Sequence, residues 1–257
     1  MEMIKYHIRE RIAYITLSRP EKRNALNAEL VSQLKNAFKK AENDTSVKVV
    51  VLNADGDVFC AGADLEYLQQ LQKNSYEENR QDSANLAELF NIIYTLKKVV
   101  IAEINGHAIA GGCGMAAVCD ISFAVPEANF GYTEVKIGFI PAIVMVFLLR
   151  KTGEGKTKEL MLSGNLINAQ TAKEYGLINF IAAKEKLAEE VYEYASKLCH
   201  ENSSQSMELT KTMMVALQEK NLNDALSFAA TMNAEARGTE DCKKGISAFL
   251  NKQKIKW

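Results

Sequence analysis

Two glycine-rich turns are the first segments of the sequence that could do chemistry. Residues 59–65 (FCAGADL) and 105–115 (NGHAIAGGCGM) place small residues where a strand is predicted to end and a helix to begin. Small residues let a backbone approach a ligand, and the first turn of a helix leaves N–H groups free. Two such turns could aim two N–H groups at one oxygen, as in an oxyanion hole. Taken alone, each turn is also explained by tight packing of a strand against a helix.

One glutamate stands apart in the stretch 130–141 (FGYTEVKIGFIP). Glu134 has mostly apolar neighbours there. Such surroundings disfavour the ionised carboxylate, so the pKa rises toward values useful for proton transfer near neutral pH. A surface glutamate, or an ion pair with Lys136, is the simpler alternative on charge alone.

The elements predicted around these segments alternate between strand and helix. Apolar alternation and β-branched runs predict strands over 4–9, 12–17, 47–53, 99–104 and 121–124. A helix is predicted over 27–43 with Asn27 as its N-cap, and the polar stretch 73–83 is predicted to be an exposed connection. This repetition predicts an α/β core over residues 1–183, and four further helices predict a helical C-terminal region over 184–257.

Composition narrows the class of protein. The 257 residues carry 31 Lys+Arg and 32 Asp+Glu, and the resulting net charge of −1 argues against a nucleic-acid binder. Hydrophobic residues make up 47%, too many for a disordered chain. No stretch approaches the roughly 20 apolar residues of a membrane span, and no secretory signal is recognisable. Five cysteines without a CxxC pair favour a reduced, cytoplasmic setting and argue against a metal site.

The segments described above, together with one near each end of the chain, occur in the same order as the motifs of a known family. They resemble the enoyl-CoA hydratase/isomerase family of the crotonase superfamily. The resemblance covers essentially the whole chain. It implies an α/β crotonase-like spiral of repeated ββα units with a helical C-terminal trimerisation region. The matching segments are 19–27 (RPEKRNALN), 59–65, 105–113 with Ala110 replacing the first of three glycines, 130–141, and 249–252 (FLNK).

The resemblance also implies roles for individual residues. The backbone N–H groups of Ala63 and Gly111 would hold the thioester oxygen of an acyl-CoA substrate as it becomes an enolate, and Glu134 would act as acid and base. No separate cofactor is implied, because coenzyme A is part of the substrate. Contacts to coenzyme A would come from Ala25, Ala61, Asp64, Leu65, Lys22 and Lys252.

Three further departures from the family pattern affect different parts of the expected site. Position 114 keeps the reaction open, position 66 puts a charge contact to coenzyme A in question, and 142–147 either reshapes the acyl end of the pocket or repacks a buried helix start. Gly114 stands where hydratases of the family have the first of two glutamates, Glu66 replaces a common lysine, and 142–147 (AIVMVF) replaces a glycine-rich stretch. Hydration of a 2-enoyl-CoA is the leading expectation. Isomerisation is its rival, because a single glutamate can shuttle a proton along an allyl system. A weaker similarity of 132–138 is to methylglutaconyl-CoA hydratases, and Glu103 is a less favoured substitute for the missing carboxylate.

Two alternative functions do not involve acyl-CoA catalysis. Lys35, Lys39, Lys40 and Lys48 could form a mildly basic patch, as in an RNA-binding relative of the fold, and Gly114 is also compatible with a non-catalytic relative. His107 and Cys113 are expected to be packed residues and not catalytic ones. The resemblance implies a homotrimer or homohexamer assembled through the C-terminal helices, which are apolar and need a partner surface.

Overall fold

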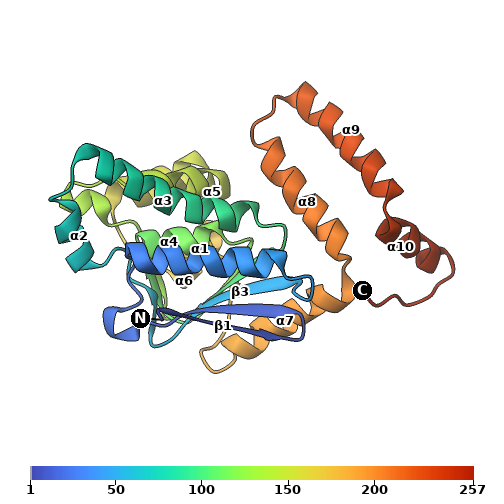
Figure 1. Cartoon of the computed structure of the whole chain (residues 1–257), viewed down its shortest axis with the longest axis horizontal. Helices are drawn as coiled ribbons and strands as arrows, with labels where there is room; N and C mark the ends of the chain where they lie inside the picture. The colour runs from blue at the N-terminus through green and yellow to red at the C-terminus, as the bar shows by residue number, and fades with distance from the viewer. Residues whose placement is uncertain (1) are drawn as a thin grey trace.

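The computed structural model describes residues 2–257 and contains two β-sheets wrapped by helices (Figure 1). The larger sheet has the strand order β1-β2-β3-β5-β7-β10, with β1 antiparallel to β2 and the other neighbours parallel. The described bounds are β1 (Ile4–Arg9), β2 (Ile12–Leu17), β3 (Val49–Ala54), β5 (Val99–Ile104), β7 (Ile121–Ala124) and β10 (Phe180–Ile181). All six residues of β2 are buried, as expected for a strand covered on both faces.

The smaller sheet has the order β4-β6-β8-β9. Its first three strands run parallel, and β9 is antiparallel to β8. The strands are β4 (Val58–Cys60), β6 (His107–Ile109), β8 (Asn129–Gly131) and β9 (Ile167–Asn168). Each of the three parallel strands is only three residues long, so the sequence pattern gave little sign of a separate sheet.

Helices cover the two sheets and continue past them. In the body of the molecule they are α1 (Ala28–Asn43), α2 (Leu65–Leu71), α3 (Tyr76–Thr95), α4 (Gly111–Val118), α5 (Ala142–Ser163), α6 (Ala169–Glu174) and α7 (Leu187–Glu201), with the short 3-10 helices η1 (Pro20–Lys22) and η2 (Glu134–Ile137). The Asn27 side chain accepts the N–H of Leu30, which confirms it as the N-cap of α1. The helices α1 and α7 lie on opposite sides of the large sheet in Figure 1.

The stretch 73–83 corrects one prediction. It is helical from Tyr76 onward, because Ser75 and Glu78 form a capping box that starts α3. The polar composition of this first helical turn concealed the helix from the sequence analysis.

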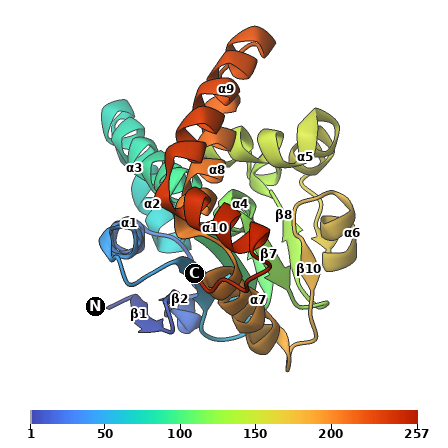
Figure 2. The same cartoon turned by 90° about the vertical axis from the view of Figure 1, so that its right-hand side faces the viewer.

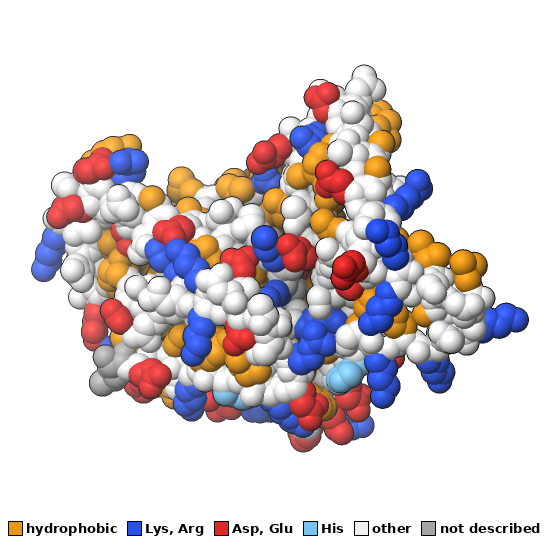
Figure 3. Space-filling model, turned by 45° about the vertical axis from the view of Figure 1, so that its right-hand side comes forward, with side chains coloured by type: hydrophobic (Ala, Val, Ile, Leu, Met, Phe, Trp, Pro, Cys, Tyr) orange, Lys and Arg blue, Asp and Glu red, His pale blue; other side chains and the backbone are white. Residues whose placement is uncertain are grey.

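The C-terminal arm consists of three helices, α8 (Ser204–Leu217), α9 (Leu222–Gly238) and α10 (Glu240–Leu250). Figures 1 and 2 show α9 projecting away from the body. Lys211 is the buried residue of α8, and no residue of α9 or α10 is buried. Figure 3 shows apolar side chains on this arm; the exposed large ones are Met214, Leu222, Leu226, Ile246, Phe249 and Leu250. The arm therefore has no core of its own.

Candidate functional site

The first glycine-rich turn is held in place by the backbone of Leu26. The Leu26 N–H donates to the carbonyl of Gly62 at 2.7 Å, and the Asp64 N–H donates to the carbonyl of Leu26 at 2.8 Å. These bonds form a parallel bridge between Leu26 and Ala63. Successive N–H groups of an extended segment point to opposite sides, so the N–H of Ala63 points away from Leu26. Ala63 is exposed between two buried neighbours, and its N–H donates to no group of the described chain.

The second turn begins α4 and lies against the first. Ala110 has φ +53° and ψ −122°, a conformation that favours glycine, and its N–H donates to the carbonyl of Gly131 at 2.8 Å. A Cβ at Gly62 would lie 2.8 Å from the Cβ of Ala110 and 3.8 Å from the amide nitrogen of Gly111. Gly111 is the first residue of α4, so its N–H has no partner within the helix. The two unpaired N–H groups therefore belong to turns in direct contact.

The third candidate group, Glu134, starts η2 just after β8. Its side chain is half-buried, and Oε2 is buried without a hydrogen-bond partner in the described chain. Burial raises the pKa of this carboxyl above its ordinary value. Burial and, to a smaller extent, the charge of Glu134 raise the pKa values of Tyr132, just before it, and of Cys113 in the first turn of α4. No ion pair within residues 2–257 joins it to Lys136.

The small sheet relates the positions of these three groups. Ala63 follows β4, Gly111 follows β6 and Glu134 follows β8, and β4, β6 and β8 are parallel neighbours in that order. The carboxyl ends of parallel strands lie at one edge of a sheet, which is where ligands bind in α/β proteins. The three residues predicted to be catalytic therefore all follow strands at the same edge of the small sheet.

The space beside Gly114, where the resemblance would place a glutamate, is filled by a side chain from α5. A Cβ at Gly114 would lie 2.2 Å from Cγ1 of Val144 and 3.0 Å from the ring of Phe90. Val144 is buried, and the Phe90 ring stacks on Phe147 at a centroid distance of 5.9 Å. The sequence departs from the family pattern both at 114 and at 142–147, and these two differences are therefore linked by the packing of Gly114 against Val144.

Glu103 lies in the large sheet and not in the small one. Its polar neighbours are Asn53, which hydrogen-bonds to it, and Tyr14. Burial raises the pKa of Glu103, but its strand β5 belongs to the other sheet from β8, the strand that Glu134 follows. The structure therefore gives no support to Glu103 as the substitute carboxylate.

The residues expected to contact coenzyme A are only partly brought together. Backbone hydrogen bonds and an ion pair tie the segments of Ala25, Ala61 and Asp64 to one another. Leu65 is 77% exposed at the start of α2. The Nζ of Lys22 lies 2.6 Å from a carboxylate oxygen of Glu66, so its charge is already paired.

Lys252 is separated from the other expected coenzyme A contacts. It follows α10, at the opposite side of Figure 1 from α2. Within one described chain, it therefore does not share a site with Lys22.

The basic patch suggested by the sequence is not a free cationic surface. Glu88 pairs with both Lys35, at 2.8 Å, and Lys39, at 3.1 Å. Lys40 lies over a tyrosine ring, and Lys48 is buried with its ammonium on backbone carbonyls. These pairings remove the observation that suggested RNA binding.

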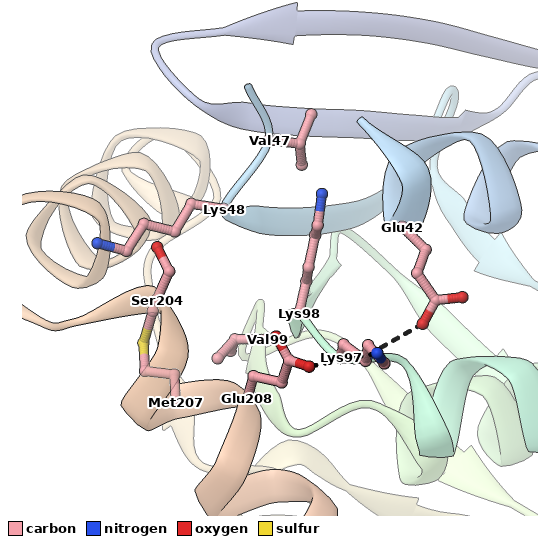
Figure 4. A pocket seen from close by; sticks show the side chains of 9 residues that line it. All are labelled: Glu42, Val47, Lys48, Lys97, Lys98, Val99, Ser204, Met207 and Glu208. Atoms are coloured by element: carbon pink, nitrogen blue, oxygen red, sulfur yellow. Dashed lines mark hydrogen bonds and ion pairs between the residues drawn. The ribbon is translucent and has the colours of Figure 1, made fainter. Parts of the chain in front are cut away.

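A cavity of about 100 Å³ lies away from this site, where the ends of α1 and α7 meet the starts of β3, β5 and α8 (Figure 4). Three lysines line it, but their ammonium groups point in different directions. Lys48 donates to the carbonyl of Cys199, Lys98 donates to a carbonyl of α1, and Lys97 pairs with a glutamate of α8 at 3.4 Å. The lysines connect elements and do not converge on a common ligand position.

Cys113 and His107 could suggest nucleophilic or acid–base catalysis, but their surroundings do not support either role. Burial raises the pKa of the Cys113 thiol to about 12, so the thiolate needed for nucleophilic attack is disfavoured. His107 is exposed and not packed as the sequence analysis expects. Its ring accepts the N–H of Asn129 at 3.1 Å, which links β6 to β8. Residues 2–257 hold no cluster of three or more potential metal ligands. No helix in that range is both long and apolar enough to cross a membrane.

Comparison with known proteins gives one consistent result. The family model for "Enoyl-CoA hydratase/isomerase" matches residues 7–257. A Thermus thermophilus protein provisionally named an enoyl-CoA hydratase is 42% identical over 94% of this chain and 95% of its own. A Syntrophomonas wolfei crotonyl-CoA hydratase is 32% identical over 95% and 94%. The crystal structure of a Mycobacterium smegmatis enoyl-CoA hydratase superimposes with a TM-score of 0.94 at 29% identity, covering 100% of this chain and 99% of that one.

Proposed function

The chain belongs to the enoyl-CoA hydratase/isomerase family, and on this premise we propose that it hydrates a 2-enoyl-CoA thioester. The N–H groups of Ala63 and Gly111 would bind the thioester oxygen as it becomes an enolate. Glu134 would remove a proton from water as the water oxygen adds to C3, and would then return a proton to C2. The protein would need no metal and no separate cofactor for these steps.

One observation carries this proposal. Two unpaired N–H groups and one carboxyl with a raised pKa follow the carboxyl ends of three adjacent parallel strands. The N–H groups belong to backbone that is hydrogen-bonded on either side, so they need little reorganisation when charge develops on the oxygen. A single donor of this kind typically lowers the barrier by about 3–4 kcal/mol. The carboxyl fits the second role because its raised pKa suits proton transfer in both directions.

Product analysis tests the proposal. Purified protein is incubated with 2-enoyl-CoA and 3-enoyl-CoA thioesters of several chain lengths, including a methylglutaconyl-CoA, and the products are separated. The proposal predicts 3-hydroxyacyl-CoA from the 2-enoyl substrates. Tight acyl-CoA binding without turnover of any substrate would contradict it and would identify a non-catalytic relative.

A second candidate function is isomerisation of the double bond. Position 114 offers no carboxylate, and Val144 fills the adjoining space. Glu134 alone could take a proton from C2 of a 3-enoyl-CoA and return it to C4. Conversion of 3-enoyl to 2-enoyl thioesters without hydrated product would favour this function over hydration.

We also propose that the protein forms a homotrimer or a dimer of trimers through its C-terminal arm. The arm exposes apolar side chains and has no buried residue in α9 or α10. An exposed apolar surface of this kind usually marks an interface. Light scattering at micromolar concentration should give three or six times the 28.5 kDa of the chain, and a monomer would contradict the proposal.

A further inference from the structure

Arg19 joins the two segments that surround Ala63. Its Nη1 donates to the carbonyl of Ala25 at 2.8 Å, and its Nη2 donates to Oδ2 of Asp64 at the same distance. Only 11% of the Arg19 side chain and 6% of the Asp64 side chain are exposed. An ion pair shielded in this way is held much more firmly than an exposed pair such as Lys22 with Glu66.

Both partners of this pair are fixed by further hydrogen bonds. Oδ1 of Asp64 accepts the N–H of Glu66 at 3.0 Å as the N-cap of α2. Burial opposes ionisation of Asp64, but hydrogen bonds and the positive charge of Arg19 outweigh it and lower the pKa below its ordinary value. The Arg19 N–H donates to the buried Asn24 side chain at 2.8 Å. With both oxygens engaged, Asp64 has a structural use that leaves it little freedom to contact a ligand.

The two acceptors of the Arg19 guanidinium, on Ala25 and Asp64, lie on opposite sides of the bridge that orients the Ala63 N–H. Ala25 precedes Leu26 and Asp64 follows Ala63, so the guanidinium spans the Leu26–Ala63 bridge. The Leu26 side chain also reaches the second turn, because its Cδ1 would lie 2.9 Å from a Cβ at Gly111. Movement of Leu26 would therefore change the position of one N–H relative to the other.

We propose that Arg19 and Asp64 are positioning residues for the pair of N–H donors. This inference rests on the proposed function, because it takes Ala63 and Gly111 as the donors. The ion pair fixes the register of Leu26 against Ala63 and thereby the direction of the Ala63 N–H. The side-chain groups of the pair are engaged with each other and with backbone, so loss of the pair should weaken stabilisation of the enolate more than ground-state binding.

Two variants separate this role from general stability. Asp64→Asn keeps an oxygen that can cap α2 but removes the negative charge, and Arg19→Lys keeps the charge but cannot span two acceptors as a planar fork. Lys184→Gln is the control, because it breaks the exposed ion pair of Lys184 with Asp57 elsewhere on the surface. Circular dichroism and thermal melting show which variants are folded, and Asp64→Asn decides alone if Arg19→Lys does not fold.

The readouts are kcat, the affinity for a saturated acyl-CoA, and ionisation of a bound 3-ketoacyl-CoA to its enolate, followed by ultraviolet absorbance. We expect kcat and the enolate fraction to fall by roughly 10- to 100-fold in both variants, as for misplacement of a catalytic donor by about 1 Å. Affinity for the saturated acyl-CoA should fall much less than kcat, and all properties of Lys184→Gln should remain as in the wild type.

The outcomes distinguish the inference from the proposed function. Folded variants with wild-type kcat and wild-type enolate fraction would overturn the inference and leave the proposed function standing. Equal loss of saturated acyl-CoA binding and of kcat would also overturn it, because the pair would then serve binding. A wild-type protein that neither turns over an enoyl-CoA nor ionises the bound 3-ketoacyl-CoA would overturn both.

Discussion

The candidate site has an N–H side, formed by Ala63 and Gly111, and a carboxylate side, formed by Glu134. The two sides differ in how many hydrogen bonds and ion pairs hold them in place. On the N–H side, the backbone of Leu26 forms hydrogen bonds to both neighbours of Ala63, and the Arg19–Asp64 ion pair links the two segments again. On the carboxylate side, one oxygen of Glu134 has no partner in residues 2–257. The first side is held by backbone bonds that small residues permit, whereas the second depends on one side chain. A change on the carboxylate side should therefore alter the reaction more readily than one on the N–H side.

Replacing Glu134 should have the largest effect. Glu134→Gln keeps the shape of the side chain but cannot accept or return a proton. We expect turnover to fall by roughly 10²- to 10⁴-fold, the usual contribution of a general acid or base. Steady-state kinetics measures the loss, and acyl-CoA titration should show binding mostly retained. Turnover that is barely affected would mean that another group handles the proton.

Removing a donor should have the next largest effect. Ala63→Pro deletes the N–H that donates to no group of the described chain, so the loss falls on the substrate oxygen. We expect kcat to fall by roughly 10²- to 10³-fold, as when one donor of an oxyanion hole is removed. Glu66→Ala, three residues further on, should change kcat much less. A folded, fully active Ala63→Pro variant would show that Ala63 is not a donor.

The sequence carries a clearer local signal for the N–H side than for the carboxylate side. Small residues at strand-to-helix turns leave a local pattern that indicates the two turns, and the resemblance then assigns the donor role within them to Ala63 and Gly111. The Arg19–Asp64 pair leaves none, because 45 residues separate its members. The contact of Gly114 with Val144 likewise depends on how α4 packs against α5. The resemblance indicated that a glutamate was absent but could not indicate what occupies its place.

The larger elements were predicted where local signals are strong. The β-branched run of β3 and the N-cap of α1 gave these elements nearly their described bounds. The strands β4 and β6 are three residues long, too short for a periodic pattern. Their pairing, which brings the site together, depends on contacts distant in sequence.

Rebuilding the second carboxylate should change which product forms. Gly114→Glu alone places a Cβ 2.2 Å from Val144 and should destabilise the protein without a gain in hydration. Combined with Val144→Gly, it should raise the ratio of hydrated to isomerised product by about 10-fold or more, because water gains a second acceptor. Val144→Gly alone is the matched control. A ratio that is equal in the control and the double variant would show that position 114 does not face the reacting carbon.

The pH dependence of turnover should show the smallest effect, and it reports on Glu134 directly. Burial disfavours the ionised form, so the pKa of Glu134 lies above the ordinary 4.5. The carboxylate must be ionised to take a proton from water, so kcat/KM should rise with pH through this raised pKa. The rise should therefore be centred above pH 4.5. The pKa of Asp64 is lowered, so the Arg19 pair stays intact over this range and does not cause the rise. A rise centred at or below 4.5, in protein that remains folded, would show that Glu134 is not the base.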